Sequence, residues 1–187
     1  MPVQFNNEHL EDLVEFTGHL LEGEDRFVCG CLQRNDSYAR TKVGGMSDFD
    51  NENYYQRIML RALLPSFPFG VKLEYGEQHF DIALFQSFSE APVALGEVKL
   101  WMGSNENQRL REMRKDIAKL SGNSCSRFLV VFTKNPKADA TRNIKGLLNK
   151  LGVKEDQPRY SFDTVYPNGR DSFEEHGQFD VIGILLD

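Results

Sequence analysis

The sequence predicts an α/β protein in which a mixed central sheet is flanked by helices. Three strand patterns follow one another closely, at 71–75, 79–86 and 92–100. Gly76 separates the first two and favours a turn, so the sheet is expected to start antiparallel. An amphipathic helix is then expected over 105–120, and a nearly continuous apolar strand over 127–134. A strand, a helix and a further strand in this order indicate a parallel crossover, which makes the sheet mixed.

The N-terminal part of the chain predicts one helix and little other regular structure. Apolar residues recur at helical spacing from Leu10 to Leu21, and Gly23 can end the helix. The stretch 27–33 fits either a short strand or a helical turn. The stretch 35–49 has few apolar residues and two adjacent glycines, so we expect a mobile loop there.

A second helix is expected to start near Asp50 and to end before Pro65, because the residue before a proline disfavours helical geometry. Its apolar side chains share one face, at Tyr55, Ile58, Met59, Ala62 and Leu63. At about 100° per residue, Glu52 projects over that same face. Glu52 is therefore a candidate inward carboxylate, although the helix dipole alone also favours an acidic residue in the first turn.

The C-terminal part adds a helix and two strands to the predicted architecture. Apolar residues from Ile144 to Leu151 define the helix, which Gly152 can close. The two further strands and their connecting turn are expected at 160–166, at 179–186 and at Asn168-Gly169.

Length and composition indicate one domain. A chain of 187 residues that is 40% hydrophobic and 27% charged fits a single domain over 1–187. Its core is expected at about 50–151, with a helical extension before it and a strand extension after it. The three cysteines lack the paired spacing of a zinc site or a disulfide framework, and no long apolar run or leader pattern is present. We therefore expect a cytoplasmic protein without a membrane partner.

Positive charge is concentrated in one segment. The net charge of −6 argues against a nucleic-acid partner, but residues 109–154 carry 12 basic and 3 acidic side chains, a balance of +9. Such a block is typical of a surface that faces a polyanion, although basic residues that merely solvate two helices would also explain it. On the helix over 105–120, four polar side chains lie opposite the apolar face and are expected to point outward: Gln108, Arg111, Lys115 and Lys119.

Two carboxylates and a lysine interrupt strands that are otherwise apolar. Asp81 and Glu97 are sixteen positions apart, and Lys99 follows Glu97 by two. A buried carboxylate is costly unless a cation or hydrogen bonds compensate it. Residues two apart on a strand share a face, so Glu97 and Lys99 point the same way. Asp81 is expected to share a face with Ala83 while Phe80 faces the other side, and pairing of the two strands would let Asp81 and Glu97 converge on one ion.

A bound divalent metal is the explanation that we favour for these charges. Mg²⁺ retains several waters and needs only one or two protein carboxylates beside a substrate phosphate. It lowers the pKa of a bound water and neutralises charge that develops on the phosphate. Lys99 could orient or deprotonate that water, and a nearby ion would favour its neutral form. Glu52 could hold a second metal, or hold Lys99 or a water in place. A buried salt bridge between Lys99 and one acid is the alternative.

The arrangement of Asp81 followed by Glu97-Val98-Lys99 resembles the PD-(D/E)xK nuclease superfamily, which has the restriction-endonuclease-like fold. The resemblance covers roughly residues 50–135, and the helical run Arg114–Leu120 is similar to the helix after the motif strand. It implies that Asp81, Glu97 and Glu52 bind Mg²⁺, for which Mn²⁺ can substitute, and that Lys99 assists the attacking water. Phe80 replaces the proline of the motif's name, and the Gln-x-x-x-Tyr signature of the recombination-exonuclease branch is absent.

The resemblance implies a Mg²⁺-dependent nuclease that hydrolyses DNA phosphodiester bonds, an endonuclease of DNA processing, restriction or defence. Gln108, Arg111, Lys115 and Lys119 would bind the nucleic acid. Sequence specificity would come from the loop over 35–49 or from a protein partner, and duplex cleavage would be easier for a homodimer. The alternative is a catalytically inactive nucleic-acid-binding or protein-interaction module on the same fold. The acidic ends of the chain, −7 over 1–53 and −6 over 155–187, would suit that alternative.

Overall fold

The structure, a computed structural model, describes residues 4–33, 52–65, 67–87, 89–102, 106–168 and 172–186. The helices are α1 (Asn7–Gln33), α3 (Glu52–Leu63), α4 (Glu106–Ser121) and α5 (Ala140–Leu151). The strands are β1 (Gly70–Tyr75), β2 (Phe80–Phe85), β3 (Ala94–Trp101), β4 (Ser126–Pro136), β5 (Arg159–Asn168) and β6 (Ser172–Leu186). Outside the described part lie the loop predicted over 35–49, Gly169 of the predicted turn, and the side chains of Cys29 and Cys31.

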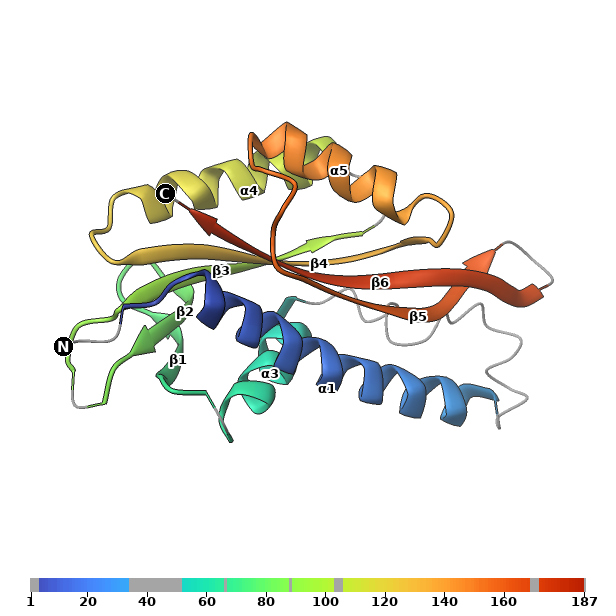
Figure 1. Ribbon diagram of the computed structural model, residues 1–187, viewed down its shortest axis with the longest axis horizontal. Helices are drawn as coiled ribbons and strands as arrows, with labels where there is room; N and C mark the ends of the chain where they lie inside the picture. The colour runs from blue at the N-terminus through green and yellow to red at the C-terminus, as the bar shows by residue number, and fades with distance from the viewer. Residues whose placement is uncertain are drawn as a thin grey trace.

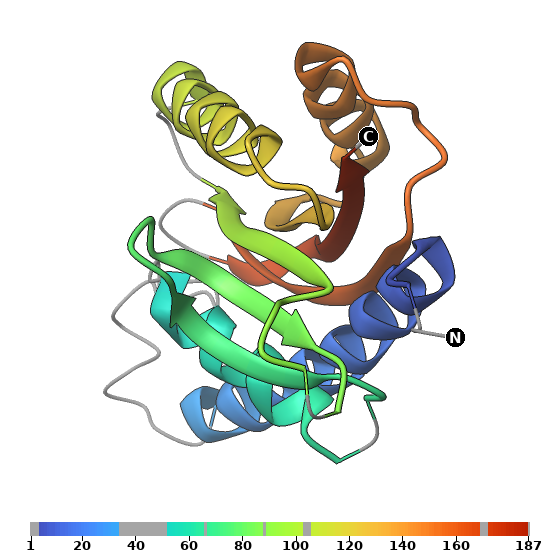
Figure 2. The ribbon, with the colours of Figure 1, turned by 90° about the vertical axis from the view of Figure 1, so that its left-hand side faces the viewer.

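The sheet is mixed, as predicted. Within the described residues it has six strands in the order β1-β2-β3-β4-β6-β5. β3 and β4 are parallel, and every other neighbouring pair is antiparallel. Helices α1 and α3 cover one face of the sheet, and α4 and α5 cover the other (Figure 1, Figure 2). The unit β3-α4-β4 is the predicted parallel crossover.

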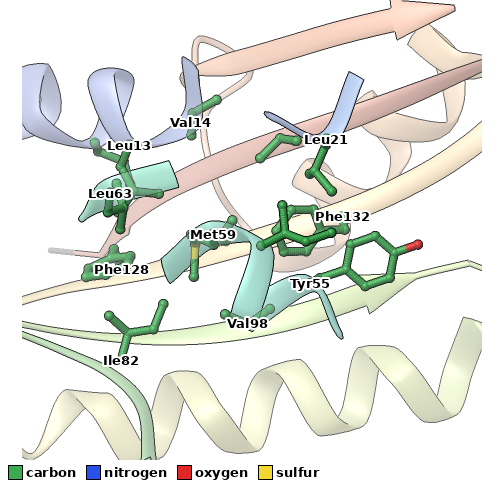
Figure 3. Packing of buried hydrophobic residues seen from close by; sticks show 14 of the residues in the cluster. Leu13, Val14, Leu21, Tyr55, Met59, Leu63, Ile82, Val98, Phe128 and Phe132 are labelled. Atoms are coloured by element: carbon green, nitrogen blue, oxygen red, sulfur yellow. The ribbon is translucent and has the colours of Figure 1, made fainter. Parts of the chain in front are cut away.

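Side-chain alternation along β4 divides the interior into two cores. Phe128 and Phe132 point to the face under α1 and α3, where they pack with Tyr55 of α3 and with Val98 of β3 (Figure 3). Leu129 and its neighbour two positions on, Val131, point to the face under α4 and α5. β4 is therefore buried on both sides, which explains its continuous apolar sequence.

Helix α1 is longer than predicted, because it does not end at Gly23. A glycine inside a helix costs about 1 kcal/mol relative to alanine, so the pattern alone favoured a stop there. Contacts beyond the glycine offset that cost: Thr164 Oγ1 of β5 donates to Asp25 Oδ2 at 2.7 Å, and Arg61 Nη1 of α3 lies 2.9 Å from Glu24 Oε1. The backbone stays helical to Gln33, so the alternative of a short strand over 27–33 is wrong.

The expected alternation of side chains along β2 is wrong at Phe80. His79 has a φ of 51°, in the left-handed region, and β2 begins only at the next residue. The Phe80 ring lies in the same core as Ala83, under α4 and α5, and a second positive φ, 51° at Glu74 of β1, marks a further irregularity of the backbone beside it. Lys119 of α4 lies above that ring, with Nζ 5.0 Å from its centre.

Segments near the two ends of the chain contribute to the same two cores as the middle of the chain does. β6 lies between β4 and β5 and pairs with β4 over ten residues. α1 crosses β6 so closely that a Cβ on Gly183 would lie 2.7 Å from Leu10 Cγ. Among the helices that the structure describes, none has both the length and the apolar character needed to cross a membrane.

Candidate functional site

The candidate site forms where β2 and β3 separate. Their backbone pairing runs from Leu84–Ala94 to Ile82–Gly96 and then stops. Asp81, which precedes Ile82 in β2, contributes its side chain where the backbone pairing stops. Its Oδ2 accepts a hydrogen bond from the backbone N–H of Val98 at 2.8 Å. The carboxylate therefore replaces a backbone acceptor at the point where the ladder opens, and it lies beside the Glu97-Val98-Lys99 segment.

Glu97 is a buried acid with a raised pKa. The residue is 2% exposed and forms an ion pair with Lys119 of α4. Burial raises the pKa of its carboxyl to about 7, and the negative charges of Asp81 and Asp116 add to that effect, while Lys119 opposes it. A glutamate in this environment is poised between its two protonation states at neutral pH.

Lys99 lies between two further acids. Its Nζ is 3.3 Å from Oε2 of Glu52 and 3.3 Å from Oδ2 of Asp116, and its side chain is largely buried. Burial alone favours the neutral amine, but Glu52, Asp116, Asp81 and Glu97 together raise the pKa of Lys99 above its ordinary value. In the absence of an ion, Lys99 is thus a cation held by carboxylates.

Glu52 reaches this cluster from the opposite face of the sheet. It is the first residue of α3, whose buried side chains include Tyr55 and Met59. Burial raises the pKa of Glu52, although Lys99 and the backbone N–H of Leu100 favour its charged form. The helix periodicity that placed Glu52 on the inward face therefore identified its position correctly.

The structure brings together Glu52, Asp81, Glu97 and Lys99, the four residues that the sequence pattern singled out as catalytic. Asp116, which the pattern missed, and Lys119, which was predicted on the outward stripe of α4, join them, and we call these six residues the Lys99 cluster. These two are three positions apart on α4, so they lie on one side of the helix. Asp116 is the single acid of the run Arg114–Leu120 in α4, which is the signal that could have identified it.

The predicted outward stripe of α4 holds for three residues and is wrong for the fourth. Gln108, Arg111 and Lys115 are exposed. Lys119 instead points to the sheet, where Nζ also donates to the backbone oxygen of His79 at 3.3 Å. It lies at the border between the polar and apolar faces of α4, and its long side chain can turn inward to neutralise the buried Glu97.

The cluster offers oxygen donors that suit a hard divalent cation. Asp81 is close enough to Glu97 for its negative charge to raise the pKa of Glu97, and one or two protein carboxylates suffice for Mg²⁺. Among the described residues, however, no three His, Cys, Asp or Glu side chains are gathered as a ready ligand set. Here Lys99 and Lys119 stand beside the acids, so an ion would have to compete with the two ammonium groups.

The fold and the cluster together define a class: a mixed α/β protein with a group of buried and partly buried carboxylates and lysines at the place where two antiparallel strands separate. The sequence matches no protein-family model, and no curated protein or solved structure is significantly similar to the chain.

Proposed function

We propose that this protein is a Mg²⁺-dependent nuclease of the PD-(D/E)xK type with a restriction-endonuclease-like fold. It would hydrolyse DNA phosphodiester bonds, as an endonuclease in DNA processing, restriction or defence. One observation carries the proposal: Asp81, Glu97, Lys99 and Glu52 meet in a single cluster although they come from three separate elements. Burial raises the pKa of two of these carboxyls, those of Glu52 and Glu97, and perturbed pKa values of this kind cluster at functional sites.

Each residue of the cluster has a role in this proposal. Asp81 and Glu97 would hold Mg²⁺, or Mn²⁺ in its place, and Glu52 would hold a second ion or position Lys99. The bound ion supplies a more acidic water and counters charge on the phosphate. Lys99 would orient the attacking water or the phosphate. Asp116, which contacts Lys99 at 3.3 Å, would keep its ammonium group directed into the site.

The exposed residues of α4 would contact the substrate. Gln108, Arg111 and Lys115 present donors on the solvent side of the helix whose inner side carries Asp116 and Lys119. Contacts of this kind to phosphates position a nucleic acid without reading its sequence. Sequence specificity would then depend on a further segment, a second copy or a protein partner.

A second candidate is a catalytically inactive nucleic-acid-binding or protein-interaction module on the same fold. The observation in its favour is that both lysines of the cluster are already paired with carboxylates, Lys99 with Glu52 and Asp116, and Lys119 with Glu97. Such a network compensates its own charges without an ion.

A cleavage assay separates the two candidates. Purified protein is incubated with single-stranded, double-stranded and branched DNA and with RNA, in Mg²⁺, in Mn²⁺ and in chelator. We expect metal-dependent cleavage of at least one DNA substrate. Asp81→Asn or Lys99→Met should lower the rate by about 100-fold or more, because each removes a group that acts on the reacting phosphate.

The matched control is Asp163→Asn. Asp163 lies on β5, away from the cluster, and forms an exposed ion pair with Lys137. It should leave the cleavage rate unchanged. Cleavage that survives both Asp81→Asn and Lys99→Met would show that another site or a contaminant is responsible. Absence of cleavage in every metal, together with retained DNA or protein binding, would support the inactive module.

A further inference from the structure

The two lysines of the Lys99 cluster hold different acids. Lys99 lies between Glu52 and Asp116, with its Nζ 3.3 Å from an oxygen of each. Lys119 forms an ion pair with Glu97 instead. Glu97 is one of the two acids proposed to hold the metal ion, so its pairing with Lys119 bears directly on how an ion reaches it.

Three groups surround the ammonium group of Lys119. Besides the ion pair with Glu97, Nζ donates to the backbone oxygen of His79 at 3.3 Å and lies 5.0 Å from the centre of the Phe80 ring. A carboxylate, a carbonyl oxygen and the face of an aromatic ring all attract a cation. Among the described residues, Glu97 is the one carboxylate in ion-pair contact with Lys119.

Lys119 is the more easily displaced of the two lysines. Its side chain is 24% exposed, whereas that of Lys99 is 14% exposed, and it makes one ion pair where Lys99 makes two. Lys99 extends from the central strand β3, whereas Lys119 extends from α4 at the border of its exposed face. A long lysine side chain can therefore turn its charged end toward solvent without movement of the helix.

A divalent ion and the ammonium group of Lys119 are attracted to the same acids. Asp81 lies beside Glu97, and it uses Oδ2 for the Val98 N–H, so its other oxygen, Oδ1, is not part of that hydrogen bond. One or two protein carboxylates suffice for Mg²⁺. An ion with twice the charge of an ammonium group is attracted more strongly by the same acids, and it repels a cation at short range.

A displaced Lys119 would lie next to the residues of α4 that are proposed to contact the substrate. Lys115 precedes Lys119 by one helical turn, and Arg111 precedes Lys115 by one turn; both are exposed. Turned outward, Lys119 would add a third cation to this side of the helix. In a nucleic acid, the groups that such cations contact are the phosphates.

We propose that Lys119 competes with the metal ion for Glu97 and that Lys119, once displaced, binds a phosphate of the nucleic acid next to the Lys99 cluster. This inference rests on the proposed nuclease function, to which it adds a link between the ion and the substrate. Binding of the ion and binding of the nucleic acid would then be coupled, and each would raise the affinity for the other by the same factor. The phosphate contact is the same in DNA and in RNA.

A metal titration tests the competition. Isothermal titration calorimetry measures the affinity for Mn²⁺ in the absence of nucleic acid, so this measurement does not depend on activity. Lys119→Met removes the ammonium group and leaves a thioether near the Phe80 ring, a favourable contact. It should bind Mn²⁺ about tenfold more tightly than the parent protein, because no ammonium group has to leave Glu97. Lys119→Gln is the second variant, should Lys119→Met fail to fold, and it should act in the same direction.

Two controls accompany the titration. Lys119→Arg keeps a positive charge and donors for Glu97, so its affinity for Mn²⁺ should stay within about threefold of that of the parent. Lys145→Met breaks an exposed ion pair with Glu155 at the helix α5. It should change the affinity for Mn²⁺ less than about twofold, because exposed charges are screened by salt.

The salt dependence of nucleic-acid binding tests the role of the displaced lysine. Fluorescence anisotropy with labelled single-stranded DNA, duplex DNA and single-stranded RNA is measured in Mn²⁺ and in chelator, and every variant carries Lys99→Met so that the probe is not cut. In Mn²⁺, Lys119→Met should reduce the slope of log affinity against log salt by about one phosphate contact, and in chelator it should leave the slope unchanged. Lys115→Met removes an exposed lysine, so it should affect the slope equally in both conditions.

Equal affinities of Lys119→Met and the parent for Mn²⁺ would overturn the inference, as would the absence of Mn²⁺ binding to both. A slope that Lys119→Met changes equally in Mn²⁺ and in chelator would also overturn it, as would the absence of measurable binding to all three probes. An active nuclease whose affinity for Mn²⁺ ignores Lys119→Met retains the proposed function and loses this role of Lys119. A protein that shows both effects of Lys119→Met but cleaves no substrate retains the inference and loses the catalytic proposal.

Discussion

Two buried carboxylates lie in the same sheet, and their surroundings differ sharply. Asp180 of β6 is fully buried, and its Oδ1 accepts hydrogen bonds from three side chains at 2.6–2.9 Å: Arg159, Ser161 and Gln178. Glu97 of β3 is 2% exposed, has one lysine as its ion-pair partner, and lies near two other acids. The partners of Asp180 come from β5 and β6 themselves, whereas those around Glu97 come from several elements.

The difference indicates what each carboxylate does. Three donors to Oδ1 of Asp180 compensate much of the cost of burying its charge, although its Oδ2 has no hydrogen-bond partner among the described residues, and this pattern suits a structural group. At Glu97 the cost is compensated only in part, so the pKa of its carboxyl rises to about 7. Burial of a poorly compensated acid destabilises a protein, and such groups persist chiefly where function requires them.

The largest effect on stability is expected at the well-compensated site. Asp180→Ala removes the acceptor of three donors and leaves Arg159, whose side chain is 28% exposed, without its carboxylate. We expect a loss of about 3 kcal/mol in the free energy of unfolding, because breaking a buried ion pair strands the remaining charge. Urea denaturation in chelator measures it. Asp163→Ala, which breaks an exposed pair with Lys137, should cost less than about 1 kcal/mol, and equal losses would contradict the assignment of Asp180.

A smaller effect is expected from the packing behind Glu97. A Cβ on Gly96 would lie 2.4 Å from the Phe128 ring, so Gly96→Ala must displace that ring or the strand. We expect a loss of about 2 kcal/mol, typical of overpacking. Gly146→Ala, with open space at its Cβ, should instead be neutral or stabilising by up to about 1 kcal/mol. Thermal unfolding compares the two, and a tolerated Gly96→Ala would show that the position of Glu97 does not depend on this contact.

A third expected effect is a dependence of stability on pH at Glu97. Its pKa in the folded protein, about 7, exceeds the ordinary value of 4.5, so folding favours the protonated acid. The stability that this preference contributes is fully present below about pH 4.5 and is lost as the pH rises to about 7. In chelator, the free energy of unfolding of Glu97→Gln, relative to that of the parent protein, should therefore be higher at pH 8 than at pH 5. Denaturant midpoints at the two pH values measure this, and a difference of the opposite sign would contradict the raised pKa.

Periodicity in the sequence predicted most of the architecture. Strand and helix positions from 71 to 151 follow local patterns of burial, and the crossover topology follows from their order. The continuation of α1 past Gly23 was not predictable, because it depends on contacts with α3 and β5 that are remote in sequence. The same applies to β6, whose place between β4 and β5 is set by pairing at long range.

The candidate site was predictable as far as its residues follow strand or helix geometry. Glu97 and Lys99 share a face because strands alternate, Asp81 lies beside them on the neighbouring strand, and Glu52 follows from the inward face of α3. Asp116 and Lys119 lie on α4, and their approach to the strands depends on how that helix packs against the sheet. An amphipathic pattern gives the direction of a side chain only approximately, so the inward turn of Lys119 required the tertiary structure.

The central position of β6 has a consequence for how the chain folds. One edge of β4 has no pairing partner until residues 177–186 have been synthesised. Until then α1 also lacks the strand that it packs against at Gly183. The two cores therefore cannot close during synthesis of the first 170 or so residues, and closure joins segments that lie far apart in the sequence. Contacts of such long range slow folding, so the nascent chain should stay open to chaperones and proteases until β6 is available.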